Sequence, residues 1–193
     1  ELMRRAAIVS PVRTGLGKFL GSLQSLTAET LAAGVIKEVV KRSGMDPEQI
    51  DDVAFAQSYS TSEAPCIGRW AALAADLPLQ VPGFQLDRRC GGGLQAIASA
   101  AMMVHTGAAD AVIAGGVESM SRAPWSVPKP THTPSVQAPV MHDTTVGWRY
   151  NNPRMDEMYP IISLGETAEA IAEEMKLSRE DQDAFALESQ KRA

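Results

Sequence analysis

The sequence predicts an α/β domain in which short buried strands alternate with helices. Three short apolar runs, at residues 53–56, 84–86 and 111–114, read as strands, and segments with helical spacing of apolar residues lie between them. Hydrophobic residues make up 45% of the 193 residues and charged residues 21%. That composition is ordinary for a globular chain that buries a core.

An earlier strand is predicted over residues 6–10, followed by a glycine-rich loop over residues 14–21. The glycine spacing in this loop matches neither the dinucleotide-binding fingerprint nor the phosphate-binding P-loop. We therefore interpret it as a surface loop.

The first helix is predicted to begin after Thr27 and to end near Gly44, two residue types that favour helix termini. Its apolar face is expected to consist of Leu31, Val35 and Val39. The elements expected next are a turn at 46–47, a strand at 53–56, a helix at 67–75, a strand at 84–86, a helix through residue 102 and a strand at 111–114.

The character of the chain changes after Ser121. Six prolines lie between Pro124 and Pro153, a stretch too long for an ordinary connection, so we expect a functional excursion or a docking arm. Regular structure is predicted to resume with a helix at Glu166. The capping-box pattern at residues 178–181 predicts the start of the last helix.

Charge and composition exclude several classes of function. The net charge of −5 and the absence of a basic run argue against nucleic-acid binding, and no apolar stretch is long enough to cross a bilayer. The two cysteines, Cys66 and Cys90, form neither a disulfide framework nor a metal-ligand pattern, which favours a reducing compartment. The chain starts without Met and stops within a predicted helix, so we expect both ends to be cut.

Cys90 is the candidate nucleophile. A strand leads into it, three glycines follow, and a helix starts at once. The amides and dipole at a helix N-terminus favour a thiolate and stabilise an oxyanion, and glycines let a substrate approach the backbone closely. The alternative interpretation is a buried structural cysteine beside glycines that only turn the chain.

Two motifs carry a resemblance to the thiolase family. Residues 86–97 resemble the active-site cysteine motif of thiolases, and residues 113–121, Ile-Ala-Gly-Gly-Val-Glu-Ser-Met-Ser, resemble its downstream partner. Residues 8–14 are similar to the family's first strand and loop. Residues 164–169 look like the segment that lines the acyl and pantetheine tunnel, and residues 178–192 resemble the helix after it.

The resemblance implies an α/β fold with the layered αβαβα architecture of thiolases, of which this chain would form the first half and the start of the inserted loop domain. Residues 1–121 would be the N-terminal core half. Residues 122–193 would be part of the loop domain, comprising the proline-rich arm and helices. Homodimers or homotetramers are usual in the family.

The resemblance also implies an acyl-CoA C-acyltransferase in which Cys90 accepts the acyl group. The reaction is a ping-pong Claisen condensation or the thiolytic cleavage of a 3-ketoacyl-CoA, with coenzyme A thioesters as substrates and no bound cofactor or metal. Ser163, Leu164 and Gly92 are the expected substrate contacts. The family usually has Asn at the position of Asp87, Ser at Gly92, and His-Met at the Ser163-Leu164 pair.

The family also uses a histidine from a Gly-His-Pro segment and a second catalytic cysteine, and neither motif occurs in this sequence. We therefore expect these residues alone to be inactive, with Cys66 structural and no base supplied by His105, His132 or His142. Two alternatives remain open: a 3-ketoacyl synthase-like enzyme, and a non-catalytic assembly or lipid-carrier module. We expect a role in fatty acid or lipid metabolism in the cytoplasm, favouring the bacterial cytosol, with mitochondrial and peroxisomal locations left open.

Overall fold

The computed structural model describes residues 4–130, 138–145 and 147–192. The chain divides into two compact units, residues 1–145 and residues 146–193. The strands are β1 (Asp52–Ala56), β2 (Phe84–Leu86), β3 (Val112–Gly116), β4 (Trp125–Ser126) and β5 (His142–Asp143). The helices are α1 (Ala28–Ser43), α2 (Ile67–Ala74), α3 (Gly92–Thr106), α4 (Pro153–Met158), α5 (Leu164–Glu174) and α6 (Arg179–Arg192), with short 3₁₀ turns η1 (Pro47–Gln49), η2 (Arg89–Gly91) and η3 (Met120–Arg122).

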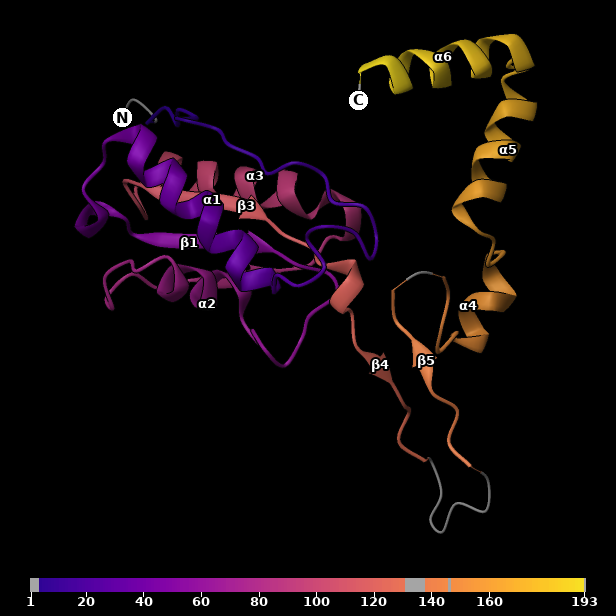
Figure 1. The fold of residues 1–193 in the computed structure, drawn as a ribbon, viewed down its shortest axis with the longest axis horizontal. Coiled ribbons are helices and arrows are strands. Elements are labelled where there is room, and N and C mark those ends of the chain that lie inside the picture. The colour runs from indigo at the N-terminus through magenta and orange to yellow at the C-terminus, as the bar shows by residue number, and fades with distance from the viewer. Residues whose placement is uncertain (1–3, 131–137, 146, 193) are drawn as a thin grey trace. The chain divides into compact units, whose positions relative to one another are not determined.

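A parallel sheet with the strand order β2-β1-β3 forms the centre of the first unit (Figure 1). β1 pairs in parallel with both neighbours, so that Ala54 lies beside Phe84 on one side and beside Ala114 on the other. The three strands predicted at 53–56, 84–86 and 111–114 are confirmed to within two residues at each end.

Helices cover both faces of this sheet, which explains why β1 is apolar at successive positions. Val53 and Phe55 pack into the cluster that contains the buried residues of α1 and α2. The alternate residues point to the other face, where the Cβ of Ala56 approaches Gly92 at the start of α3. A parallel strand buried on both faces reads as a continuous apolar run. The first unit is therefore a layered α/β/α arrangement.

α1 begins and ends where the sequence predicts. Gly44 closes it with a φ of +66°, a left-handed conformation that favours glycine. Thr27 occupies the N-cap position, but its hydroxyl bonds the side chains of Glu29 and Thr30 instead of a backbone amide. The prediction for the apolar face was wrong by about one position, since the buried residues of this helix are Ala28, Ala32, Ala33 and Ile36. Small residues occupy the face because α1 packs directly on α2.

The contact between α2 and β2 depends on two glycines. A Cβ added to Gly68 would lie 2.2 Å from the Phe84 carbonyl oxygen, and one added to Gly83 would lie 2.5 Å from the Arg69 amide nitrogen. Both clashes are with backbone, which side-chain movement cannot relieve. α2 therefore sits closer to the sheet than any side chain at these positions allows.

The strand predicted at residues 6–10 is not formed. Residues 4–10 make no ladder with the sheet, and Ile8 is 75% exposed. A strand needs a neighbour that accepts its hydrogen bonds, and the described residues provide none for this segment. The glycine-rich stretch after it is a loop, as predicted, and the Leu20 amide donates to the Ser121 hydroxyl at 2.8 Å.

Beyond β3 the first unit ends in a short antiparallel hairpin of β4 and β5. In the second unit, α5 begins two residues before the predicted Glu166, and α6 begins at Arg179 after the predicted cap at Ser178. α4 was not predicted, although Asn152 and Pro153 supply an N-cap and a first-turn proline. Among the described residues, no helix combines the length and apolar character needed to span a membrane.

Candidate active site

The loops that follow the three parallel strands all leave the sheet at the carboxyl ends of the strands. β1 leads to Ser58, β2 to Asp87 and Cys90, and β3 to Glu118. Because the carboxyl ends of parallel strands lie at the same edge, these side chains come together although they are far apart in the sequence. The motif residues of the sequence analysis are therefore neighbours in the fold.

Cys90 lies in the 3₁₀ turn η2 between β2 and α3; the residue is exposed and its thiol forms no disulfide. The prediction of a cysteine at a strand-to-helix turn is confirmed. A Cβ added to Gly91 or Gly93 would meet no atom within 4 Å, so no other described residue crowds the chain at these two positions. The buried structural cysteine considered from the sequence does not match this exposed position.

Gly92 behaves differently from the glycines beside it. It is buried, and an added Cβ would lie 2.8 Å from the Cβ of Ala56 on β1. Its missing side chain therefore leaves room for the helix to pack on the sheet. The substrate contact expected at Gly92 stays a prediction.

The amides of the turn are partly used within it. The Gly91 amide donates to the Arg88 carbonyl at 3.0 Å, and the Gly92 amide donates to the Arg89 carbonyl. The positive end of the α3 dipole still lies at Cys90, because the helix continues from Gly92 without a break.

Asp87 holds the residues before the nucleophile. Its Oδ1 accepts hydrogen bonds from the Ser58 hydroxyl and the Arg89 amide, both at 2.8 Å, and its Oδ2 pairs with the Arg89 guanidinium at 3.0 Å. The Arg89 amide, and then the Ser58 hydroxyl, lower the pKa of Asp87. Arg89 has a φ of +48°, a left-handed conformation uncommon for a residue with a side chain.

Glu118 ties the loop after β3 to the loop after β1. Its carboxylate accepts hydrogen bonds from the amides of Ser58 and Tyr59. Burial raises the pKa of Glu118, the two amides oppose that effect, and the nearby Asp87 carboxylate adds to it. These contacts make Glu118 an organiser of hydrogen bonds between the two loops. Ser58 was missed, since no local pattern marks it.

Cys66 and His105 lie elsewhere. Cys66 is at the N-cap position of α2, with its Sγ 3.5 Å from the Gly83 carbonyl oxygen in the close contact between α2 and β2. His105 lies in the last turn of α3, at the end opposite Cys90. No hydrogen bond joins the Cys90 thiol to a side chain in the part of the chain that the structure describes.

Ser163 and Leu164 lie at the start of α5, in the second unit. Ser163 forms a full capping box with Glu166: its hydroxyl accepts from the Glu166 amide at 3.2 Å, and the Glu166 carboxylate accepts from the Ser163 amide at 2.7 Å. Leu164 is 84% exposed. The capping-box spacing was present in the sequence and was not used. The tunnel contacts expected of both residues stay predictions.

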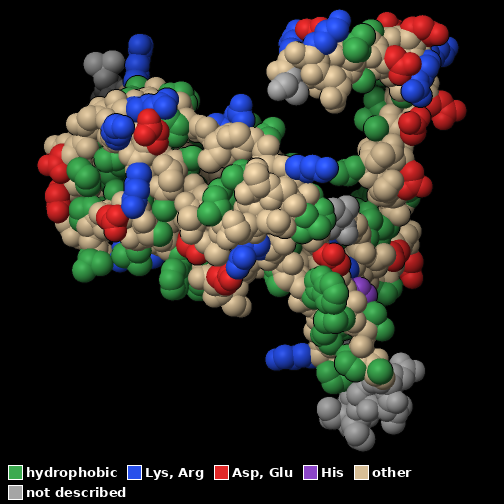
Figure 2. Space-filling view, viewed as in Figure 1, with side chains coloured by type: hydrophobic (Ala, Val, Ile, Leu, Met, Phe, Trp, Pro, Cys, Tyr) green, Lys and Arg blue, Asp and Glu red, His purple; other side chains and the backbone are tan. Residues whose placement is uncertain are grey.

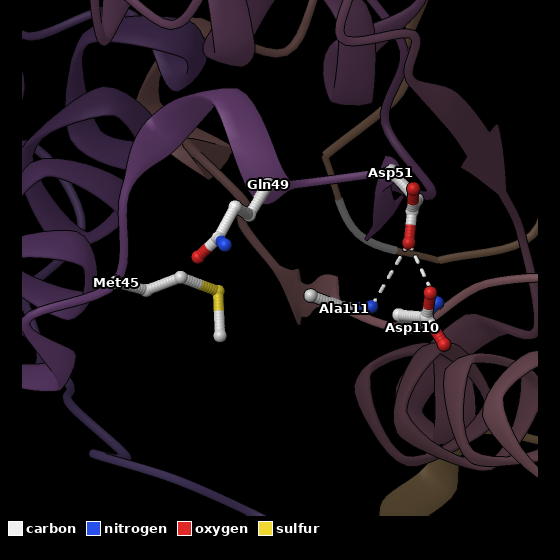
Figure 3. A pocket seen from close by; sticks show the side chains of 5 residues that line it. All are labelled: Met45, Gln49, Asp51, Asp110 and Ala111. Atoms are coloured by element: carbon white, nitrogen blue, oxygen red, sulfur yellow. Dashed lines mark hydrogen bonds between the residues drawn. The ribbon is translucent and has the colours of Figure 1, made fainter.

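The surface of the first unit has one hollow at the carboxyl ends of the strands and another at their amino ends. A hollow of ≈ 480 Å³ is lined by the loop after β1 and by the segment after β3. Another, of ≈ 380 Å³, lies at the opposite edge, where the Asp51 carboxylate accepts from the amides of Asp110 and Ala111 (Figure 3). Both hydrogen bonds lower the pKa of Asp51, and the one from the Ala111 amide has the larger effect. This second hollow is at the amino ends of the strands, away from Cys90.

Comparisons with known proteins agree with the motifs. Residues 6–193 match the family model described as "Thiolase, N-terminal domain". The chain is 45% identical over 192 residues to the 3-oxoadipyl-CoA/3-oxo-5,6-dehydrosuberyl-CoA thiolase of Escherichia coli K12, covering 98% of this chain and 48% of that protein. It is 37% identical to the acetyl-CoA acetyltransferase of Cupriavidus necator, covering 99% of this chain and 47% of that protein.

The fold agrees as well. The crystal structure of the Bacillus anthracis acetyl-CoA acetyltransferase superposes with a TM-score of 0.84 at 34% sequence identity, over 96% of this chain and 45% of that one. The thiolase-like fold predicted from the sequence is confirmed, and the chain spans about half the length of the relatives it matches. From the cysteine turn, the matching family model and the shared fold, we conclude that this chain belongs to the thiolase family.

Proposed function

We propose that this chain supplies the nucleophilic half of an acyl-CoA C-acyltransferase, with Cys90 as the acyl carrier. The observation that supports this most directly is the exposed residue Cys90, with a free thiol, in a glycine turn at the N-terminus of α3. A long substrate needs an accessible cysteine, and the uncrowded positions at Gly91 and Gly93 are consistent with that need. The family membership gives the turn its chemistry.

The proposed reaction has two steps. The Cys90 thiolate attacks the carbonyl carbon of an acyl-CoA, and CoA leaves as its thiolate, so that one thioester is exchanged for another. In condensation the enolate of acetyl-CoA then attacks the acyl-cysteine and releases the thiol. In the degradative direction, Cys90 attacks a 3-oxoacyl-CoA, acetyl-CoA leaves, and CoA removes the shortened acyl group. A covalent intermediate divides one difficult carbon–carbon step into two easier ones.

The substrates proposed are 3-oxoacyl-CoA thioesters. Relatives named as thiolases of 3-oxoadipyl-CoA, at 45% identity, support an acyl chain longer than acetoacetyl, and the relative named as an acetyl-CoA acetyltransferase supports the shorter one. Assays with both thioesters separate these two substrate classes. No cofactor is needed for the proposed steps.

Assembly and location are also proposals. A homodimer or homotetramer is proposed because it is usual in the family. A cytoplasmic location is proposed, supported by two free cysteines, which suit a reducing compartment. A role in lipid metabolism is proposed from the acyl-CoA chemistry of the family. Acidic and basic side chains are interspersed over the face of the first unit drawn in Figure 2, with no continuous basic patch of the kind that nucleic-acid binding uses.

Labelling of the two cysteines tests the proposed nucleophile. At neutral pH, iodoacetamide is expected to label Cys90 faster than Cys66, and incubation with acetyl-CoA is expected to place an acetyl group on Cys90. Peptide mass spectrometry measures both. C66S serves as the matched control and should keep the acetyl label, whereas C90S should lose it. Labelling of Cys90 no faster than of Cys66, together with no acetyl transfer, contradicts the proposal.

A further inference from the structure

Asp87 lies just before the turn that contains Cys90, and its carboxylate makes several contacts there. Its carboxylate receives a backbone amide, a hydroxyl and a guanidinium, two from Arg89 and one from Ser58. The side-chain oxygen that accepts the amide two residues ahead forms a local turn, which here encloses the start of η2. Asp87 therefore fixes the backbone immediately before Cys90.

Arg89 needs such support. Its φ of +48° is unfavourable for a residue with a Cβ, and it persists only where surrounding contacts impose it. The amide bond to Asp87 Oδ1 is one such contact, and the guanidinium bond to Oδ2 is another. If Arg89 relaxed to an ordinary φ, the chain direction into Cys90 would change, and with it the position of the thiol at the start of α3.

Ser58 anchors the carboxylate to the rest of the site. Its hydroxyl donates to Asp87 Oδ1, while its amide donates to Glu118. Asp87 is thus held from the β1 loop as well as from its own turn. The charged groups around it are Arg89, which pairs with it, Glu118 across Ser58, and Arg88, which bonds the Gln95 side chain.

We propose that Asp87 is a positioning residue for the nucleophile: its Oδ1 holds the left-handed Arg89 turn and thereby keeps the Cys90 thiol at the N-terminus of α3. This inference rests on the proposed role of Cys90. The acceptor oxygen, more than the charge, performs this task, because the ion pair with Arg89 is exposed to water and such pairs contribute little.

The two ways in which Asp87 could influence Cys90 predict opposite effects. Loss of a nearby negative charge alone favours a thiolate, so both D87N and D87A would speed alkylation and move its pH profile to lower pH. Loss of positioning withdraws the thiol from the helix terminus, which disfavours a thiolate. On our proposal D87A therefore slows Cys90 alkylation at neutral pH by about two- to fivefold, the scale of a helix-terminus effect, and moves its profile to higher pH.

The test measures iodoacetamide alkylation of Cys90, with Cys66 in the same sample as the internal reference, across mildly acidic to mildly alkaline pH. D87N keeps an acceptor oxygen and is expected to retain the wild-type profile, whereas D87A is expected to shift it. S58A leaves the Arg89 amide bond possible and should shift the profile in the same direction by less. Faster alkylation in D87A or S58A, or an unchanged D87A, overturns the proposal.

Two further measurements keep the outcomes distinct. Amide hydrogen exchange is expected to rise in D87A for the peptide that contains η2 while the β1 peptide keeps its protection, which shows that the variant is folded; an unchanged η2 peptide counts against the proposal. If Cys90 is no faster than Cys66 in the unsubstituted chain, the proposed nucleophile is wrong. If Cys90 is alkylated faster than Cys66 and D87A does not change its alkylation rate, the proposed nucleophile is retained and the positioning role of Asp87 is wrong.

Discussion

Between Gly92 at the start of α3 and Ala56 on β1 there is room for a single Cβ, and Ala56 supplies it. The Cβ of Ala56 would lie 2.8 Å from a Cβ at Gly92, and a strand Cβ cannot move away as the end of a long side chain can. Glycine at one position is thus required by alanine at the other. The thiolase pattern of Ser at the Gly92 position therefore requires α3 or β1 to shift in this chain, unless residue 56 changes as well.

We therefore expect G92S to lower the free energy of unfolding by about 1–3 kcal/mol, the usual cost of overpacking a helix–sheet contact. A56G should restore most of the loss in the double variant, although A56G alone is expected to cost roughly 0.5–1 kcal/mol because glycine weakens a strand. Urea unfolding of the four chains in a double-mutant cycle measures the coupling.

G93A is the matched control, because a Cβ at Gly93 meets nothing within 4 Å. Replacing a helical glycine with alanine should stabilise the chain by roughly 0.5–1 kcal/mol. Additive effects of A56G and G92S would show that the two residues do not compete for the same space.

At the scale of elements, hydrogen bonds from Glu118 join two loops that leave different strands. Its carboxylate accepts the amides of Ser58 and Tyr59, so the loop after β1 keeps its shape only while that acceptor is present. Burial is the largest influence on this carboxyl and raises its pKa. The loop therefore depends on a carboxyl whose oxygens are needed as hydrogen-bond acceptors but whose charged form is disfavoured by burial.

The stability of the site should consequently depend on pH through Glu118. A carboxyl whose pKa is raised on folding contributes most below its unfolded value, near 4.5, and that contribution is lost as the pH rises through the folded value. E118Q keeps an acceptor without the charge, so we expect it to be at least as stable as the parent chain at neutral pH, with the difference closing in mild acid.

E118A is the contrasting variant. It leaves two amide donors without this acceptor and should cost about 1 kcal/mol at either pH. Thermal unfolding at two pH values measures all three chains. If E118Q proves less stable than the parent at neutral pH by as much as E118A, the anion itself is needed and the expected direction of the pH dependence is wrong.

The elements that the sequence predicted well are those defined by local signals. Gly44 and Ser178 mark their helix termini within a few residues, so α1 and α6 were placed correctly. The strand at residues 6–10 was wrong because a strand is completed by a partner elsewhere, and an apolar run does not reveal whether that partner is present. For the same reason the turn at Cys90 was predicted, whereas its support by Ser58, 29 residues earlier than Asp87, was not.

At the scale of the whole molecule, the two units differ in how much of each is buried within the unit itself. No described residue of α5 or α6 is buried, whereas β1 is buried at four successive positions. The domain boundary expected after residue 121 stays a prediction.

At this scale we also expect no efficient thiolysis by the 193 residues alone. They contain Cys90 but no Gly-His-Pro segment. General acid–base assistance is typically worth about a hundred- to ten-thousandfold in rate, and we expect a deficit of at least that size relative to the Escherichia coli relative. Acetoacetyl-CoA and 3-oxoadipyl-CoA cleavage in the presence of CoA is the measurement. Efficient turnover that disappears in C90A would locate the base within this sequence.

The close seating of α2 on β2 has a consequence for motion. With Gly68 and Gly83 in direct backbone contact, that helix has no free distance in which to slide toward the sheet, and a single methyl at either glycine would force the layers apart. The loop between β1 and α2 lies outside this contact and is not restrained by it. That loop carries Ser58, so a change in its shape would reach Asp87 and, on our proposal, the alignment of the nucleophile.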